Sequence, residues 1–135
     1  MRVFPDTNVL ASAFGTRGLC ADLMGLVLQD HELITGEVII GELRRVLKRK
    51  FGVPPASINE IEKLLRSYHV EPKPRDLPEL KLRDRNDRLV VASAINGRAE
   101  VLVTGDLEML DLEQKPPGLK ILRVRDFWNL AAGKQ

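Results

Sequence analysis

The stretch ELITGEVIIGELRRVLKRK, residues 32–50, joins a short apolar run directly to a segment with helical periodicity. The run at residues 32–35 has the length and composition expected of a strand. In residues 37–50 the apolar side chains recur at three- and four-residue spacing and fill one broad arc of a helix. The stretch therefore predicts a strand that passes straight into an amphipathic helix.

The same alternation of strand and helix continues along the rest of the chain. Apolar runs predict strands at residues 2–4, 101–104 and 120–123, and a weaker one at residues 67–71. Helical spacing predicts helices at residues 9–14, 19–29, 57–66, 87–96 and 127–131. Short strands that are apolar on both faces and alternate with helices are typical of a parallel sheet covered on both sides. We expect a three-layer α/β/α sandwich.

Length, charge and cysteine content limit the domain organisation and the class of protein. A chain of 135 residues with 44% hydrophobic residues suits a single domain, residues 1–135, with its own core. Its 21 Lys and Arg against 19 Asp and Glu are too nearly balanced for total charge to indicate nucleic-acid binding. Cys20 is the only cysteine, which excludes an internal disulfide and favours a reducing compartment. No signal peptide or membrane-spanning run is recognisable, so we expect a cytoplasmic protein without a membrane partner.

Acidic residues follow the predicted strands. Asp6 comes directly after the first strand, Asp106 after the fourth, and Glu42 lies on the helix that follows the second. Asp84 and Asp87 stand at the start of the helix 87–96. In open α/β sheets ligands gather beyond the carboxyl ends of the strands, and strands one and four are neighbours at the switch point of a doubly wound sheet. We therefore expect these carboxylates to converge.

Two residues bear on where these elements end. Pro5 cannot donate a hydrogen bond to a sheet, so the first strand is expected to end there. Gly97 follows the helix 87–96 and is expected to end it in a left-handed conformation.

Each acid also has an ordinary structural explanation. Glu42 falls within the apolar arc of its helix, on the side opposite Arg44, Arg45 and Lys48, yet at the edge of that arc it can reach water or an arginine. An aspartate after a strand or at a helix start is common in turns and caps. Several carboxylates in one cleft, however, repel one another unless they are protonated or bridged by cations. Ligands of oxygen alone favour Mg²⁺ or Mn²⁺, which supports hydrolysis of a phosphate ester.

Four motifs in order resemble the PIN-domain ribonucleases: Asp6-Thr7-Asn8, the helical Glu42, RDRND at residues 83–87, and VTGD at residues 103–106. The chain is most similar to the short prokaryotic, VapC-like members that are the toxin components of toxin–antitoxin pairs. The resemblance implies a five-stranded parallel sheet in the order 3-2-1-4-5 and cleavage of RNA that depends on Mg²⁺ or Mn²⁺. It also implies a cognate antitoxin and often a homodimer.

The resemblance assigns roles to individual acids. Asp6, Glu42, Asp87 and Asp106 match the acidic quartet of the family. The three aspartates are expected to hold the metal directly or through water, with Asp84 as an additional acid. The glutamate is expected to hold the metal or to orient the attacking water.

Polar neighbours of the quartet are matched as well. Thr7, Asn8 and Thr104 correspond to residues that usually support the acids. Pro5 departs from the usual apolar residue before the first aspartate, which bears on the end of the strand but not on the acid.

Five cations fall within residues 44–50, on the helix that carries Glu42. A solvated helix face explains them, and so does contact with an RNA backbone, which provides affinity without reading sequence. For the second interpretation the residues are Arg44, Arg45, Lys48 and Arg49. Aromatic residues make up only 4% of the chain, so a platform that stacks several bases is not expected.

Other functions remain open at this point. The chain could be an RNA-processing nuclease without an antitoxin, or a PIN fold that binds RNA or a partner without cutting. Asp106 and Asp111 resemble an acidic motif of haloacid-dehalogenase-like phosphatases, but that chemistry needs an aspartate where this chain has Asn8. A signalling receiver domain needs an aspartate after the third strand, where this chain has Glu71 and Pro72.

Overall fold

Residues 1–133, described by a computed structural model, contain one sheet of five parallel strands. The strands are β1 (Arg2–Pro5), β2 (Glu32–Gly36), β3 (His69–Glu71), β4 (Val101–Val103) and β5 (Lys120–Leu122). Their order across the sheet is β3-β2-β1-β4-β5, and every neighbouring pair is parallel. The predicted sheet and its order are confirmed.

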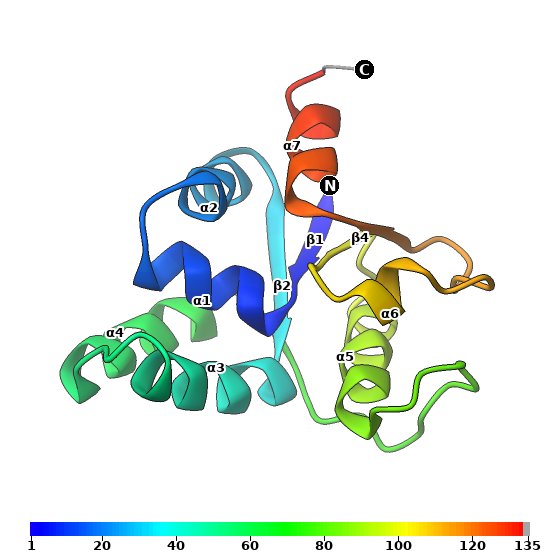
Figure 1. Ribbon diagram of the computed structural model, residues 1–135, viewed down its shortest axis with the longest axis horizontal. Coiled ribbons are helices and arrows are strands. Elements are labelled where there is room, and N and C mark those ends of the chain that lie inside the picture. Colours follow the sequence, from blue (N-terminus) through cyan, green and yellow to red (C-terminus); the bar gives the residue numbers. More distant parts are fainter. Residues whose placement is uncertain (134–135) are drawn as a thin grey trace.

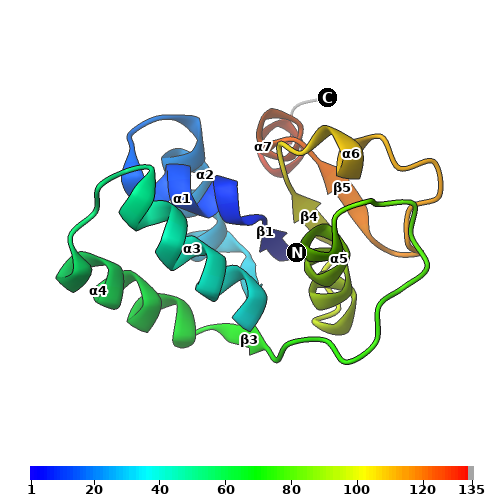
Figure 2. The ribbon, with the colours of Figure 1, turned by 60° about the horizontal axis from the view of Figure 1, so that its bottom comes forward.

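Helices cover both faces of the sheet. They are α1 (Thr7–Gly15), α2 (Leu19–Asp30), α3 (Glu37–Arg49), α4 (Pro55–Arg66), α5 (Arg85–Asn96), α6 (Leu107–Leu110) and α7 (Val124–Ala131). Figures 1 and 2 show α1 to α4 on one side of the sheet and α5 and α6 on the other, and α7 packs against α2. The three-layer α/β/α sandwich is therefore confirmed. Among residues 1–133 no helix combines the length and the apolar character that a membrane span requires.

The core lies where the sheet meets these helices. The β1 and β4 side chains Val3, Phe4, Leu102 and Val103 are completely buried, as expected for strands covered on both faces. On α3 the arc predicted from the sequence is largely buried, whereas its cations face outward or toward α4. From α7, Phe127 is fully buried, and its ring packs edge-on against His31.

Two element ends bear on the predictions made from proline and glycine. Pro5 is the last residue of β1, so the predicted end of the strand is confirmed to within one residue. The left-handed conformation predicted for Gly97 is wrong, because Gly97 has φ −78° and the positive φ of 57° belongs to Arg98. Gly97 is instead required by close packing, since a Cβ there would lie 2.6 Å from Ile34 Cγ2.

Candidate active site

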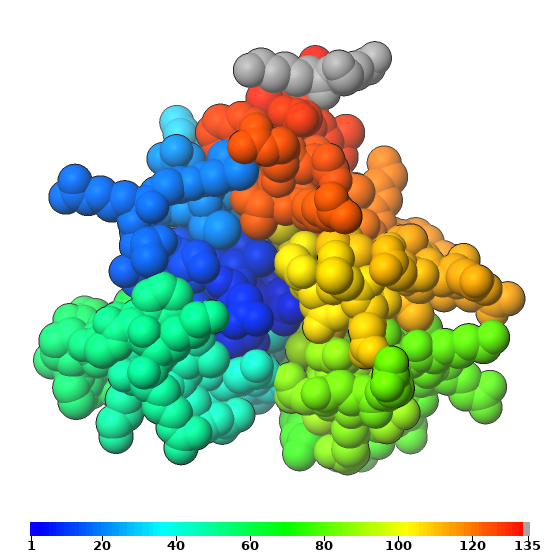
Figure 3. Space-filling model, viewed as in Figure 1, coloured from blue at the N-terminus to red at the C-terminus, as the bar shows by residue number. Residues whose placement is uncertain are grey.

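The carboxyl ends of β1 and β4 bring two of the predicted acids together. Pro5 is in register with Val103, and the Asp6 amide donates to the Val103 carbonyl over 2.8 Å. Asp6 and Asp106 therefore leave the sheet side by side, at its central pair of strands. Figure 3 shows a hollow in the surface here, with α3 on one side, α5 and α6 on the other, and the start of α1 at its base.

Asp6 is the most deeply buried of these acids, at 9% exposure. Its Oδ1 accepts from the Thr7 amide over 2.8 Å, and its Oδ2 accepts from the Thr104 hydroxyl over 2.7 Å. Desolvation by burial raises the pKa of Asp6, and the charges of Glu42 and Asp106 raise it too, against the lowering effect of the two hydrogen bonds. Burial of this carboxylate therefore lowers the stability of the fold, and the two hydrogen bonds offset only part of that cost.

Asp84 and Asp106 each cap a helix with one carboxylate oxygen. Asp84 Oδ1 accepts from the Asn86 amide over 2.7 Å at the start of α5. Asp106 Oδ1 accepts from the amides of Glu108 and Met109, which opens the short helix α6. The sequence predicted capping for such residues, but it missed α6 itself, whose only signal is the aspartate before it. The second oxygen of each acid has no hydrogen-bond partner within residues 1–133.

Asp87 lies in the first turn of α5 and is half-buried without a capping role. Burial raises its pKa to about 6, and the nearby charges of Asp106, Asp84, Asp6 and Glu108 add to the shift. In residues 1–133 no lysine or arginine forms an ion pair with Asp6, Asp87 or Asp106. The acids therefore stand close enough to repel one another, and none of these three is paired with a cation among residues 1–133.

Glu42 joins this group from the opposite wall of the hollow. It is half-buried on α3, and its Oε2 accepts a hydrogen bond of 2.6 Å from Asn86 Nδ2 on α5. Asn86 is a site residue that sequence reasoning did not single out. Its signal was its position in the RDRND motif, one residue before Asp87.

Thr7 and Thr104 support Asp6 in different ways. The Thr104 hydroxyl donates to Asp6 and also accepts from the Asp106 amide over 3.0 Å, so it links the two acids. Thr7 contributes its backbone amide, whereas its buried hydroxyl has no hydrogen-bond partner within residues 1–133.

A basic groove of about 510 Å³ runs beside the acids along α3. Its lining residues are Asn8, Glu42, Arg45, Val46, Arg49, Lys50, Asp84 and Asn86. The predicted placement of Arg45 opposite Glu42 is wrong, because three helical residues later a side chain lies only about 60° around the helix. Arg45 and Arg49 therefore share one groove with a member of the acidic quartet.

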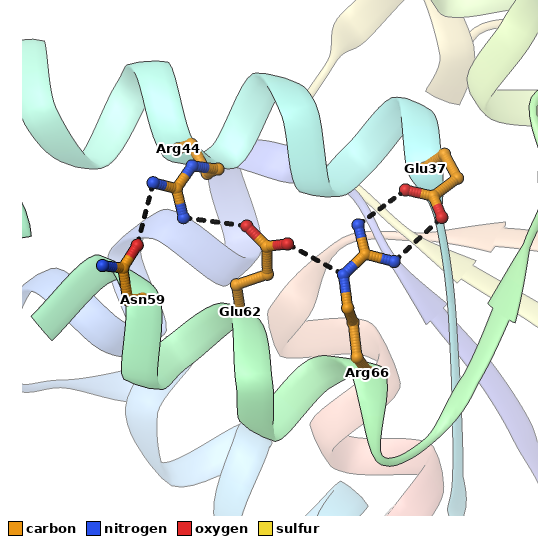
Figure 4. Close-up of polar contacts among 5 residues, drawn as sticks. All are labelled: Glu37, Arg44, Asn59, Glu62 and Arg66. Carbon is orange, nitrogen blue, oxygen red and sulfur yellow. Dashed lines mark hydrogen bonds and ion pairs between the residues drawn. The ribbon is translucent and has the colours of Figure 1, made fainter. Parts of the chain in front are cut away.

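Arg44 and Lys48 lie on α3 but do not line the basic groove. Arg44 turns toward α4, where it donates to Glu62 over 2.8 Å and to Asn59 over 3.0 Å. Figure 4 shows how Glu62 and Glu37 also bind Arg66, so that these side chains tie α3 to α4. The charge of Arg44 is thus engaged within the fold, while Lys48 is exposed.

The carboxylate oxygens of Asp6, Asp87 and Asp106 fit a hard divalent cation that keeps most of its coordinated water. Within residues 1–133 no three His, Cys, Asp or Glu side chains are arranged to hold one ion together. Mg²⁺, however, usually takes only one or two carboxylates and completes its octahedron with water and substrate oxygens. The burial of Asp6, the raised pKa of Asp87 and the lack of a pairing protein cation all favour such an ion here.

Comparison with known proteins agrees with this architecture. The sequence profile of the PIN domain matches residues 2–108. The chain belongs to the PIN-domain family. PIN domains are generally nucleases and typically use divalent metal ions. The matched region includes all four acids of the quartet.

A solved structure shows the same PIN fold. One chain of the crystal structure of VapBC2 from Rickettsia felis superposes on this chain with a TM-score of 0.65. That structure was determined with a DNA fragment from the VapBC2 promoter. The two chains are 16% identical, over 91% of this chain and 98% of the other. No curated protein sequence matches this chain.

Proposed function

We propose that this PIN domain is an endoribonuclease that depends on Mg²⁺ or Mn²⁺ and hydrolyses RNA phosphodiester bonds. The observation that carries the proposal is the gathering of Asp6, Glu42, Asp87 and Asp106 around one hollow, from four different elements or turns. Acids held together at this cost are suited to hold a divalent cation against a phosphate group. That cation supplies charge stabilisation and an acidified water.

The protein residues have separate tasks in this proposal. Asp6 and Asp87, with Asp106, hold the ion directly or through water, and Asp84 contributes its free oxygen. The hydrogen bond from Thr104 orients Asp6 and lowers its pKa, against the larger raising effect of burial. Glu42, fixed by Asn86, accepts a hydrogen bond from the water that attacks the phosphorus or binds the ion.

Arg45 and Arg49, with Lys50, hold the RNA backbone in the basic groove. Their charges lie beside the acids, so they attract the strand without pairing with the carboxylates that the ion requires. Lys48 adds an exposed charge on the same helix, whereas Arg44 is engaged by Glu62. Backbone contacts of this kind predict binding that weakens steeply with salt.

The resemblance to VapC-like proteins supports a cellular role as a toxin, and the fold shared with a chain of VapBC2 is consistent with it. We propose that residues 1–135 form a single-domain toxin, cytoplasmic and homodimeric, that a cognate antitoxin silences. The alternative is an RNA-processing nuclease of the same chemistry. Induced expression in a bacterial host separates them: a toxin arrests growth, Asp87→Asn relieves the arrest, and a silent wild type favours RNA processing.

The activity is tested by incubating RNA with the wild type, Asp6→Asn and Asp87→Asn in Mn²⁺ and in Mg²⁺. We expect cleavage by the wild type alone, abolished by EDTA. Equal cleavage by all three proteins would refute the site assignment. Hydrolysis of p-nitrophenyl phosphate in the same buffers, without cleavage of RNA, would indicate a phosphatase.

A further inference from the structure

A second pocket adjoins the acids on the side away from α3. It has a volume of about 700 Å³ and lies between residues 79–83, which lead into Asp84, and residues 108–114, which follow Asp106. Figure 2 shows these two segments side by side, beyond α5 and α6. Arg83 and Glu108 connect its two walls by an ion pair of 3.4 Å. The charge of Glu108 also raises the pKa of Asp87, so Glu108 lies near that acid. The pocket therefore opens next to the proposed site of cleavage.

The walls of this pocket combine apolar surface with hydrogen-bond acceptors. Leu80, half-buried, and Leu112, buried in the core, both line the pocket and give it an apolar wall. Its exposed polar residues are four carboxylates, one amide and two cations: Glu79, Glu108, Asp111, Glu113, Gln114, Lys81 and Arg83. Acceptors therefore outnumber the cationic donors. Its volume is in the range of pockets that hold small organic ligands. The pocket therefore suits an uncharged aromatic group that carries donors on its edge.

We propose that this pocket binds an unpaired guanine base of the RNA, next to the bond that is cut. The inference rests on the proposed function and specifies the substrate of the same site. Single-stranded RNA is read on the Watson–Crick edges of splayed bases. Guanine alone presents two adjacent donors there, N1–H and N2–H, which match the two acceptor oxygens of one carboxylate.

The other bases fit these walls less well. Adenine and cytosine place an amino donor beside a ring acceptor, and uracil places one donor between two carbonyl acceptors, so each faces a carboxylate with at least one repulsive pair. A base is also neutral, unlike a phosphate, and so is not repelled by Glu79, Asp111 or Glu113. Lys81 and Arg83 in the lining offset the charge of a phosphate that flanks the base.

The RNA strand would then cross the acids in one direction, from α3 to α6. Arg45 and Arg49 hold its backbone on the α3 side of the acids, and the pocket holds a base on the α6 side. Affinity and selectivity come from different walls, since phosphate contacts carry no sequence information and base contacts do.

The test is a titration of the ¹⁵N-labelled full chain, without divalent metal, with the 5′-monophosphates of guanosine, adenosine, cytidine and uridine. All four carry the same phosphate, so a difference in binding belongs to the base. We expect the guanosine nucleotide to shift the amide signals of Leu80, Leu112 and Gln114. Its affinity should exceed that of the other three by about tenfold, the effect of one charge-assisted hydrogen bond.

Substitution identifies the carboxylate. Glu79→Gln, Asp111→Asn and Glu113→Gln each replace an acceptor pair with an amide of the same shape, and at least one should reduce guanosine binding to the adenosine level. Glu60→Gln, an exposed change on α4, is the matched control and should leave it unchanged. The same spectra show whether each variant is folded.

Several results would overturn the inference: equal binding of all four nucleotides, shifts confined to Arg45 and Arg49, or no loss in any of the three variants. Shifts of the pocket signals by an arginine-rich peptide without any by the guanosine nucleotide would also overturn it, in favour of a basic protein partner. Cleavage of an RNA pool separates this inference from the proposed function. Cutting without guanine preference refutes only the inference, and guanine binding without cutting refutes only the nuclease.

Discussion

The hydroxyl of Thr104 donates a hydrogen bond of 2.7 Å to Asp6, and both residues are buried at the carboxyl ends of the two central strands. The same hydroxyl accepts from the Asp106 amide. One side chain thus orients the carboxylate on β1 and the turn after β4. The acid most costly to bury therefore depends on Thr104, the threonine of the VTGD motif.

Replacing Thr104 by valine should reveal this dependence. The change keeps the shape but leaves a buried carboxylate with one partner fewer, which costs about 1–3 kcal/mol. We expect Thr104→Val to lower the free energy of unfolding by that amount at pH 7, measured with urea. Thr35→Val is the matched control, because the Thr35 hydroxyl is buried with no partner within residues 1–133 and its loss should be neutral or stabilising. Equal losses in both variants would contradict the role of the Thr104–Asp6 bond.

The pKa of Asp87, raised to about 6, predicts a dependence of stability on pH. A carboxyl whose pKa is higher in the folded than in the unfolded chain binds its proton more tightly when folded, so its ionisation destabilises the fold. This penalty is absent below the ordinary value of 3.8 and complete above about 6. In EDTA, Asp87→Asn should therefore gain stability over the wild type as pH rises from 4 to 7.

The measurement is a series of urea midpoints across that range of pH for both proteins. Asp76→Asn, a change at an exposed loop position, controls for the loss of a negative charge in general. A difference between wild type and Asp87→Asn that stays constant with pH would show that burial and neighbouring acids do not act on Asp87.

Divalent metal should relieve the same repulsion. An ion that binds only the folded chain stabilises it by about 2.7 kcal/mol when its free concentration is 100 times its Kd. We expect Mn²⁺ to raise the melting temperature of the wild type, and EDTA to reverse the effect. Asp6→Asn and Asp87→Asn should lose most of the increase, whereas Glu60→Gln should retain it. An identical increase in all of these proteins would place the ion elsewhere.

Asn86 should matter for turnover more than for stability. Its amide holds Glu42 from across the hollow, and removal of partners that orient catalytic ligands typically costs about 10–100-fold in activity. We expect Asn86→Ala to lower kcat by about that factor, with little change in KM for RNA. Asn59→Ala is the control, since that amide accepts from Arg44 on the far side of α3. Unchanged kcat in Asn86→Ala would show that Glu42 needs no such support.

Substitution of Arg45 should affect RNA binding, whereas substitution of its neighbour Arg44 should affect thermal stability. Arg45 lines the basic groove, so Arg45→Ala should weaken RNA binding and reduce the slope of log affinity against log salt by about 1. Arg44 pairs with Glu62, so Arg44→Ala should lower thermal stability and leave that slope unchanged. Salt titrations and melting curves of both variants test this, and a reversed pattern would contradict the proposed groove.

The sequence by itself determined the layers, the order of the elements and the acids. Helical periodicity marked the helices, and short continuous apolar runs marked the strands, because these strands are buried on both faces. Asp6 and Asp106 could be placed side by side before the structure was known, since the first and fourth strands of a doubly wound sheet are neighbours at its switch point. The motif resemblance then selected Asp6, Glu42, Asp87 and Asp106 from the candidate acids as one quartet.

Only the tertiary structure decided how the side chains are used. Helix geometry separates Arg44 and Arg45 by about 100°, but only packing decides that Arg44 meets Glu62 of α4 and that Arg45 faces the basic groove. The bonds of Thr104 to Asp6 and of Asn86 to Glu42 join residues 98 and 44 positions apart. Such contacts depend on how distant elements pack, and no local pattern encodes that packing.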